Sequence, residues 1–257
     1  MNRVGRSLKH AGRWAPLFIW AVVSILAESA HAQILPPHPT MVFYVATGDS
    51  DACAADCGQW IVAEGPIGVG SVARLRAVLD RLGKEKLPVF FDSGGGFFDE
   101  ALDMGKLLRQ RGLTAGIAKT IPAACSTTQE CEDLKRSGKI VKATKWPESG
   151  RCNSTCVYAF VGAEARLVGP DARIAVHATR LAIVKKNGRI DSVDITRAST
   201  QQKVSFNRFD TTLKAYFLKM GIDVRLADLV KNTPFDQLHY LTREEIVKFG
   251  IDRVADH

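Results

Sequence analysis

The sequence predicts an α/β domain built around a parallel sheet, and two observations lead to this prediction. Short β-branched or aromatic runs alternate along the chain with amphipathic segments of helical period. The run at 87–91 is apolar almost throughout, as expected of a strand that helices cover on both faces. Right-handed crossovers between parallel strands would then lay the helices against the sheet.

The expected elements follow one another in a regular order. One helix is N-capped by Ser71, a second follows the glycine turn at 94–96 and closes at Gly112, and a third begins at Ser154 and ends near Gly162. Strands are expected at 41–46, 60–64, 87–91, 113–118, 166–168 and 173–176. This β-turn-α-β order is typical of a single α/β domain.

The first 32 residues have the pattern of a secretory signal peptide. An apolar stretch at 14–27, too short to favour a membrane span, precedes the small-x-small site Ala30-His31-Ala32. Four basic residues come first: Arg3, Arg6, Lys9 and Arg13. We expect cleavage after Ala32 and a periplasmic or secreted protein, or a membrane-anchored one if the segment is not cleaved. Removing four basic residues and the acidic Glu28 lowers the net charge from +8 to +5.

The remaining chain divides into two expected parts. Residues 33–59 form an N-terminal extended segment with a cysteine loop, and 60–257 form the α/β domain. A polar, basic insertion at 125–151 interrupts this domain. It is either a surface insertion or a lid beside Ser154, and we favour the surface insertion. The basic residues are scattered without aromatic neighbours, so we expect no nucleic-acid partner.

All six cysteines follow the signal segment, and their even number in an exported chain favours disulfides. Their spacing suggests three local pairs, although the connectivity stays open. We expect no metal site, since neither CxxC pairs nor suitably spaced histidines accompany the cysteines. The six candidates are Cys53, Cys57, Cys125, Cys131, Cys152 and Cys156.

Three short segments together suggest a catalytic site. The run Asp92-Ser93-Gly94-Gly95-Gly96-Phe97 supplies a backbone turn that would bind an oxyanion. In Cys152-Asn153-Ser154-Thr155-Cys156, the serine stands at a helix start, where free N–H groups favour negative charge. His177 follows the strand run Ile174-Ala175-Val176 and would act as the base. The alternatives are that Ser154 merely caps its helix and that His177 is structural.

These motifs resemble the Clp protease proteolytic subunit, in the Clp/crotonase superfamily, and especially its exported bacterial relatives. The glycine turn is similar to the family's serine–proline–glycine–glycine turn, with Gly94 in place of proline. The run 170–177 is similar to the strand that carries the family's histidine, and 240–252 to its closing helix and turn. The resemblance covers about 60–254. It implies a ββα superhelix and an oxyanion hole, which we assign to the N–H groups of Gly96 and Phe97.

This chain departs from the family pattern at two places. Ala178-Thr179 replaces the glutamine–proline pair after the histidine. Leu238 stands where the family has its catalytic aspartate, and Asp236, two residues earlier, is the candidate replacement. A serine–histidine dyad without an acid is also conceivable, since the third member mainly orients the imidazole.

The function predicted from the sequence is a serine hydrolase or peptidase of Clp type, acting through Ser154, His177 and Asp236 without a cofactor. The alternative is a catalytically decayed module that binds peptides or partner proteins in the cell envelope; an acyl-CoA enzyme is a weaker third choice. Expected partners are peptides or unfolded segments. A helix expected at 194–220 has more apolar positions than one face needs, and these either contact a second copy or belong to the core of one chain. No Walker motif occurs in the chain, and an ATP-driven unfoldase is not expected.

Overall fold

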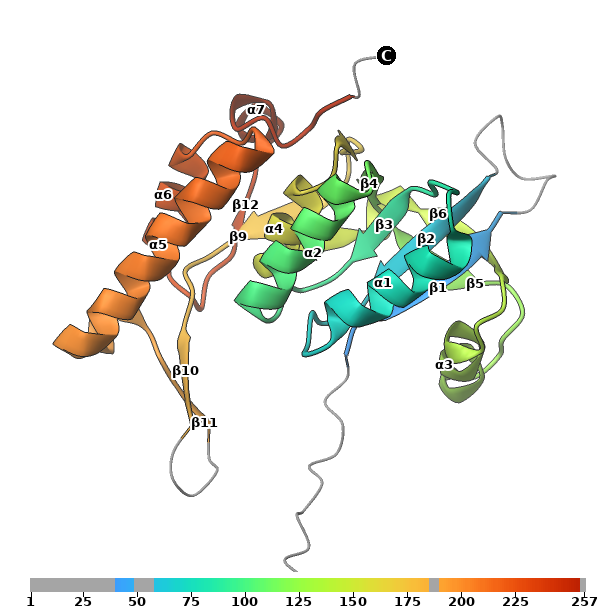
Figure 1. Cartoon of the computed structure of the whole chain (residues 1–257), viewed down its shortest axis with the longest axis horizontal. Coiled ribbons are helices and arrows are strands. Elements are labelled where there is room, and N and C mark those ends of the chain that lie inside the picture. Colours follow the sequence, from blue (N-terminus) through green and yellow to red (C-terminus); the bar gives the residue numbers. More distant parts are fainter. Residues whose placement is uncertain (1–39, 49–57, 185–189, 255–257) are drawn as a thin grey trace, which may run out of the picture. The chain divides into compact units, whose positions relative to one another are not determined.

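The structure is a computed structural model that describes residues 40–48, 58–184 and 190–254 (Figure 1). Its main sheet has seven strands in the order β5-β6-β1-β2-β3-β4-β8. Strands β2, β3, β4 and β8 are parallel neighbours, whereas β1 runs antiparallel to β2. The strands are β1 (Val42–Thr47), β2 (Gln59–Glu64), β3 (Val89–Asp92), β4 (Thr114–Ile117), β5 (Lys119–Pro122), β6 (Val141–Trp146) and β8 (Ala165–Leu167). The predicted α/β class with a mostly parallel sheet is confirmed.

Three helices pack with this sheet around the main core: α1 (Ser71–Leu82), α2 (Phe98–Gln110) and α4 (Thr155–Val161). All of α4 is buried, and α1 buries the face that includes Leu75, Val78 and Leu79. Ser71 was expected to cap α1, but it is the first helical residue. The N-cap is Gly70 at φ +78°, a conformation that glycine adopts without the cost of a Cβ, while Ser71 Oγ accepts the Gly68 N–H at 3.0 Å.

A second, three-stranded sheet has the order β12-β9-β7 and joins distant parts of the chain. Its strands are β7 (Arg151–Asn153), β9 (Arg173–Val176) and β12 (His239–Tyr240). β7 runs parallel to β9 with Asn153 opposite Ala175, and β12 runs antiparallel to β9. A bridge between Ser93 and Cys152 ties β7 to the segment that follows β3. This small sheet therefore brings the three candidate segments together.

The polar insertion at 125–151 is more regular than its sequence predicts. It contains α3 (Thr128–Arg136), strand β6 and the short 3-10 helix η1 (Pro147–Ser149), and β6 pairs with β1 and β5 of the main sheet. Lys135 Nζ lies 2.6 Å from Glu64 Oε1 and fixes α3 near β2. Figure 1 shows α3 beside β1 and β5, apart from α4 and β9. The insertion thus extends the sheet edge and does not form a lid over Ser154.

The helix expected at 194–220 begins later than predicted. A hairpin of β10 (Leu181–Val184) and β11 (Ile190–Val193) and the short 3-10 helix η2 (Ile195–Arg197) come first. Helix α5 (Thr200–Met220) then starts with a capping box between Ser199 and Gln202. Four of its apolar side chains, those of Phe206, Leu213, Tyr216 and Phe217, are buried within the chain, and Phe209 packs on Phe98 at 4.7 Å between ring centroids. Val204 and Leu218 are exposed, so contacts within one chain account for most, but not all, of the large apolar side chains of α5.

The chain closes with α6 (Arg225–Asn232) and α7 (Arg243–Lys248), and a buried arginine ties the following turn to α4. Arg166 is fully buried and donates to the carbonyls of Val161, the last residue of α4, and of Ala163. It also donates to the Gly250 and Ile251 carbonyls, at 2.8 Å each. Together with Arg109, which donates to the Gly162 and Ala163 carbonyls, it satisfies acceptors at the end of this buried helix.

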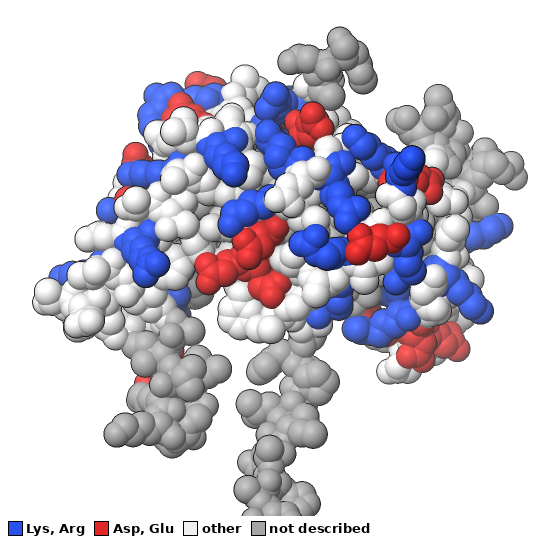
Figure 2. Space-filling model, viewed as in Figure 1, with Lys and Arg blue, Asp and Glu red and all other residues white. Residues whose placement is uncertain are grey.

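No helix within the described ranges is both long and apolar enough to cross a membrane. On the face drawn in Figure 2, lysines and arginines are interspersed with acidic residues and form no single-sign field. Several predicted features lie outside the described residues: the signal peptide at 1–32, its cleavage site, most of the segment at 33–59, and the pair Cys53 and Cys57.

Candidate active site

Ser154 occupies a sharp turn between β7 and α4. Its backbone has φ +58° and ψ −128°, and it is the only non-glycine residue with positive φ among those the structure describes. Such a conformation is costly for a side chain bearing a Cβ, and it clusters at functional sites. A strained strand-to-helix turn is also the geometry that exposes the nucleophile of serine hydrolases. The Ser154 hydroxyl makes no capping hydrogen bond to α4, so capping does not explain this residue.

The described part of the chain contains two disulfides, and one of them spans this turn. Cys152 of β7 is bonded to Cys156 in the first turn of α4, with 5.2 Å between their Cα atoms. Both residues are fully buried. The other bond joins Cys125 to Cys131 at the start of the insertion. Two of the three expected local pairs are therefore formed; the third involves Cys53 and Cys57, which are not described.

His177 follows β9, directly beside the serine turn. The Ser154 N–H donates to the Ala175 carbonyl at 2.7 Å, which sets Ser154 and His177 at the ends of adjacent parallel strands. His177 Nδ1 lies 2.8 Å from the Ala178 carbonyl, which can only accept, so Nδ1 carries the hydrogen. In the neutral ring, Nε2 is then free to accept a proton. Burial lowers the pKa of His177, and the charge of Arg180 adds to this shift.

The expected acid, Asp236, does not contact His177 in the described structure. Asp236 is exposed, and the ring hydrogen bond of His177 goes to the Ala178 carbonyl instead. The neighbouring Phe235 takes the position beside the imidazole, edge to face, with 4.7 Å between ring centroids. The Arg180 guanidinium lies over the ring of the same Phe235, 4.0 Å from its centroid. A backbone carbonyl therefore orients His177, while the sequence suggested a carboxylate.

The N–H groups assigned to the oxyanion hole are already used. Gly96 N–H donates to Thr155 Oγ1 at 2.7 Å, and Phe97 N–H donates to the Ile67 carbonyl at 2.8 Å. A Cβ on Gly96 would lie 2.1 Å from the Ile67 carbonyl oxygen, so this glycine serves the bridge between the two segments. In this structure neither predicted donor is available to an oxyanion.

Gly95 and Thr155 are the residues that lie against Ser154, and the sequence interpretation missed both. A Cβ on Gly95 would lie 2.8 Å from Ser154 Cβ and 3.0 Å from the Thr155 nitrogen. Thr155 directly follows the nucleophile, the position whose N–H commonly forms half of an oxyanion hole. The signal was present in the order of the residues: the central glycine of the triplet and the residue after the serine. At such turns, the N–H of the residue after the serine commonly donates to the oxyanion.

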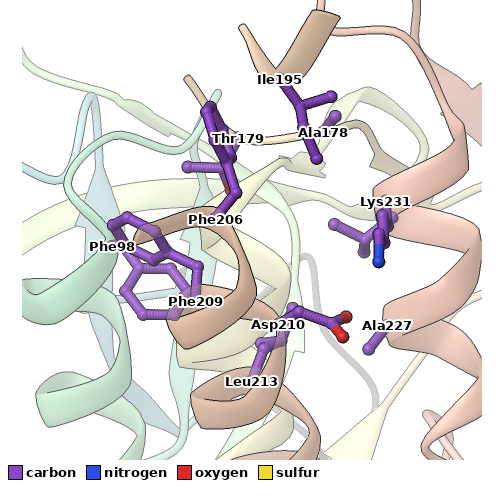
Figure 3. Close-up of a pocket in the computed structure, with 11 residues that line it drawn as sticks. Phe98, Ala178, Thr179, Ile195, Phe206, Phe209, Asp210, Leu213, Ala227 and Lys231 are labelled. Atoms are coloured by element: carbon purple, nitrogen blue, oxygen red, sulfur yellow. The ribbon is translucent and has the colours of Figure 1, made fainter. Parts of the chain in front are cut away.

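An apolar pocket of about 40 Å³ adjoins His177 (Figure 3). Ala178 and Thr179, the residues after His177, form one wall, and Phe98 and Phe209 lie together on another. Helix α6 closes the far side with Ala227, Val230 and Lys231. The pocket has the character of a site for an apolar side chain or acyl group. Among the described residues, no three His, Cys, Asp or Glu side chains gather as metal ligands would.

Comparison with known proteins yields structural matches at low identity. No protein-family model and no curated protein sequence matches this chain. One solved structure is a variant of the 1510-N membrane-bound stomatin-specific protease, with 16% identity, a TM-score of 0.47, and coverage of 76% of this chain and 77% of the other. A second variant of it, in complex with a substrate peptide, has 16% identity, a TM-score of 0.46, and coverage of 76% and 73%.

ClpP1 from Listeria monocytogenes is similar at 12% identity, with a TM-score of 0.43 and coverage of 76% of this chain and 91% of that protein. The resemblance predicted from the motifs is thus confirmed as a structural match. At these values the roles of individual residues rest on the geometry of this chain alone.

Proposed function

We propose that this chain is a serine hydrolase of peptides or unfolded protein segments, with Ser154 as nucleophile and His177 as general base. The observation that supports this most is the Ser154 backbone, held at positive φ where a strand turns into a helix, with a histidine at the end of the adjacent strand. A hydroxyl that neither caps its helix nor lies in relaxed backbone needs another explanation. Nucleophilic catalysis supplies one.

In the proposed reaction, His177 Nε2 takes the Ser154 proton as the hydroxyl oxygen attacks a carbonyl carbon. The Ala178 carbonyl keeps Nδ1 protonated, so Nε2 is the basic nitrogen. Thr155 N–H, against which Gly95 lies, replaces the N–H groups of Gly96 and Phe97 as the proposed donor to the oxyanion. His177 then protonates the leaving group, and water releases the acyl group from Ser154.

The apolar pocket suggests which substrates fit. Its walls begin at Ala178 and at Phe98, which follow the base and the glycine turn respectively. A side chain next to the reacting carbonyl is proposed to reach it, and a volume of about 40 Å³ admits only a small apolar group. A location in the cell envelope remains part of this proposal, because it rests on the predicted signal peptide.

The alternative is a peptide-binding module that has lost catalysis. Two observations favour it: Asp236 is not bonded to His177, and the N–H groups of Gly96 and Phe97 are committed elsewhere. Without a carboxylate, the imidazolium that forms during attack is less stabilised, so turnover slower than that of a full triad is expected even for an active enzyme.

Labelling by a fluorophosphonate probe separates the two functions. The purified protein with intact disulfides is expected to be labelled covalently, and Ser154→Ala is expected to abolish this labelling. His177→Ala should slow it by about 10²–10⁴-fold, the usual contribution of a general base. Circular dichroism of both variants checks that they are folded. Equal labelling of Ser154→Ala would remove this serine from the mechanism, and a folded wild type that resists the probe would favour the binding module.

A further inference from the structure

We infer that Cys152 and Cys156 are positioning residues: their disulfide holds Ser154 in its left-handed backbone conformation and thereby keeps the hydroxyl reactive. This inference deepens the proposed function and rests on it. The bond starts in the middle of β7 and ends in the first turn of α4, so Ser154 is the central residue of the closed loop. Neither cysteine touches substrate, because both are fully buried.

Chain geometry makes the disulfide and the turn depend on each other. An extended chain would separate residues four apart by about 13 Å. A disulfide tolerates only about 4.4–6.8 Å between Cα atoms, and the observed separation is 5.2 Å. A change in the Ser154 backbone moves Cys152 relative to Cys156, and the bond limits how far these two residues can separate. The bond therefore opposes the relaxation that Ser154 would otherwise favour.

Hydrogen bonds and close packing also hold the turn. Ser154 N–H donates to Ala175, Thr155 Oγ1 accepts from Gly96, and Gly95 lies against Ser154. None of these contacts fixes the distance between the residues on either side of Ser154 as a covalent bond does. A residue in a costly backbone conformation persists only where its surroundings over-determine it. In this chain, the disulfide is the contact that supplies this constraint on both sides of Ser154.

The chain offers a matched control in its second disulfide. Cys125 and Cys131 are six positions apart, against four for Cys152 and Cys156, so the two bonds restrict the unfolded chain to a similar degree. The control bond joins the segment before α3 to α3 itself, and Figure 1 shows α3 apart from α4, the helix that follows Ser154. Removing either bond releases a covalent restraint on the unfolded chain, but only removal of the Cys152–Cys156 bond frees the turn at Ser154.

The first experiment compares C152A/C156A with C125A/C131A. Labelling rates are measured over a range of fluorophosphonate concentrations, together with thermal unfolding. We expect the saturating rate to fall by about 10–100-fold in C152A/C156A, the scale of a displaced reacting group, while the half-saturating concentration is unchanged. The control variant should label as the wild type does. If C152A/C156A fails to fold, C152V/C156A restores buried volume without the bond. An unchanged saturating rate in a folded variant overturns the inference.

A second experiment does not require any activity. Ser154→Gly and Ser154→Ala are each made in the wild-type background and in C152A/C156A, and the four melting temperatures are compared. Glycine accepts positive φ without a Cβ penalty, so the glycine variant should melt above the alanine variant while the disulfide is present. Without the disulfide this gap should shrink by more than half, because the turn relaxes. An unchanged gap overturns the inference. If the wild type resists labelling, the proposed function fails, and this gap alone decides the role of the disulfide.

Discussion

The two sheets of this domain are built in opposite ways. The seven-stranded sheet is made mostly of strands that are near neighbours in sequence, and its residues are buried among aliphatic and aromatic side chains. The three-stranded sheet joins three short segments at 151–153, 173–176 and 239–240, and it ends at Ser154 and His177. Both sheets contribute residues to the main core, Cys152, Ile174 and Val176 among them, but only the second carries a disulfide and ends at the candidate site. Core residues of the large sheet should therefore affect stability without affecting reactivity.

The largest effect on stability is expected in the seven-stranded sheet. Ile61 is fully buried in the centre of β2, between β1 and β3. Ile61→Ala removes apolar volume from a packed core and should lower the free energy of unfolding by about 2–5 kcal/mol. The labelling rate of the folded protein should stay unchanged. Chemical denaturation measures the first quantity and probe kinetics the second, and a slowed probe reaction in folded protein would contradict the separation of the two sheets.

Gly95→Ala should show the reverse pattern. The new Cβ would lie 2.8 Å from both Asn153 O and Ser154 Cβ, at a φ of +95°. We expect labelling to fall by about 10²–10³-fold, as when one oxyanion donor is lost. Gly94→Ala is the matched control, because no atom lies within 4 Å of the Cβ it would add. Equal labelling of the two variants would show that the close approach of Gly95 to Ser154 is not needed.

The pH dependence of labelling tests how His177 is placed. Its pKa is lowered from the ordinary 6.5, chiefly by burial, and labelling requires the neutral ring. The acid limb of the rate profile should therefore lie below pH 6.5. Arg180→Met removes a positive charge that lowers this pKa, so the limb should move to higher pH. Arg197→Met is the control: the Arg197 side chain is 84% exposed, and its removal should leave the acid limb at the same pH. A limb above pH 6.5 in the wild type would contradict the partly buried position of His177.

The smallest effect is expected at Asp236. Since the Ala178 carbonyl orients the imidazole, Asp236→Asn should leave the labelling rate unchanged. A triad acid replaced by its amide costs about 10⁴-fold in the best-known case. A loss on this scale would show that Asp236 moves to His177 when substrate binds and would restore the sequence-based assignment.

The sequence predicted the large sheet well and the small sheet poorly. Local periodicity and apolar runs report burial, so β2, β3, β4 and the helices α1 and α2 were expected near their observed positions. β7 and β12 are only three and two residues long, and both pair with β9, which is distant from them in sequence. The hairpin β10–β11 was also missed, although β10 is apolar and pairs with the strand that follows it. Strand β6, within a basic segment, was missed because its burial comes from the neighbouring β1.

In the candidate site, too, local motifs were predictable from the sequence and contacts between distant segments were not. Ser154 and His177 were identified from local motifs, and the structure sets them at neighbouring strand ends. The use of Gly96 N–H by Thr155 Oγ1 and of Phe97 N–H by Ile67 was not predictable, because both bonds link segments distant in sequence. The replacement of a carboxylate by the Ala178 carbonyl also leaves no trace in composition or spacing, since every residue carries that group.

The buried guanidinium of Arg166 has a consequence for the order of events during biosynthesis. Its acceptors at the end of α4 come early, but the carbonyl of Ile251 is 85 positions later in the chain. At about 5–20 residues per second, a ribosome needs roughly 4–17 s to add those residues. Until then the guanidinium has its acceptors at Val161 and Ala163 but lacks those at Gly250 and Ile251. The growing chain can thus form its seven-stranded sheet, which ends at Leu167 of β8, before all the partners of the Arg166 side chain exist.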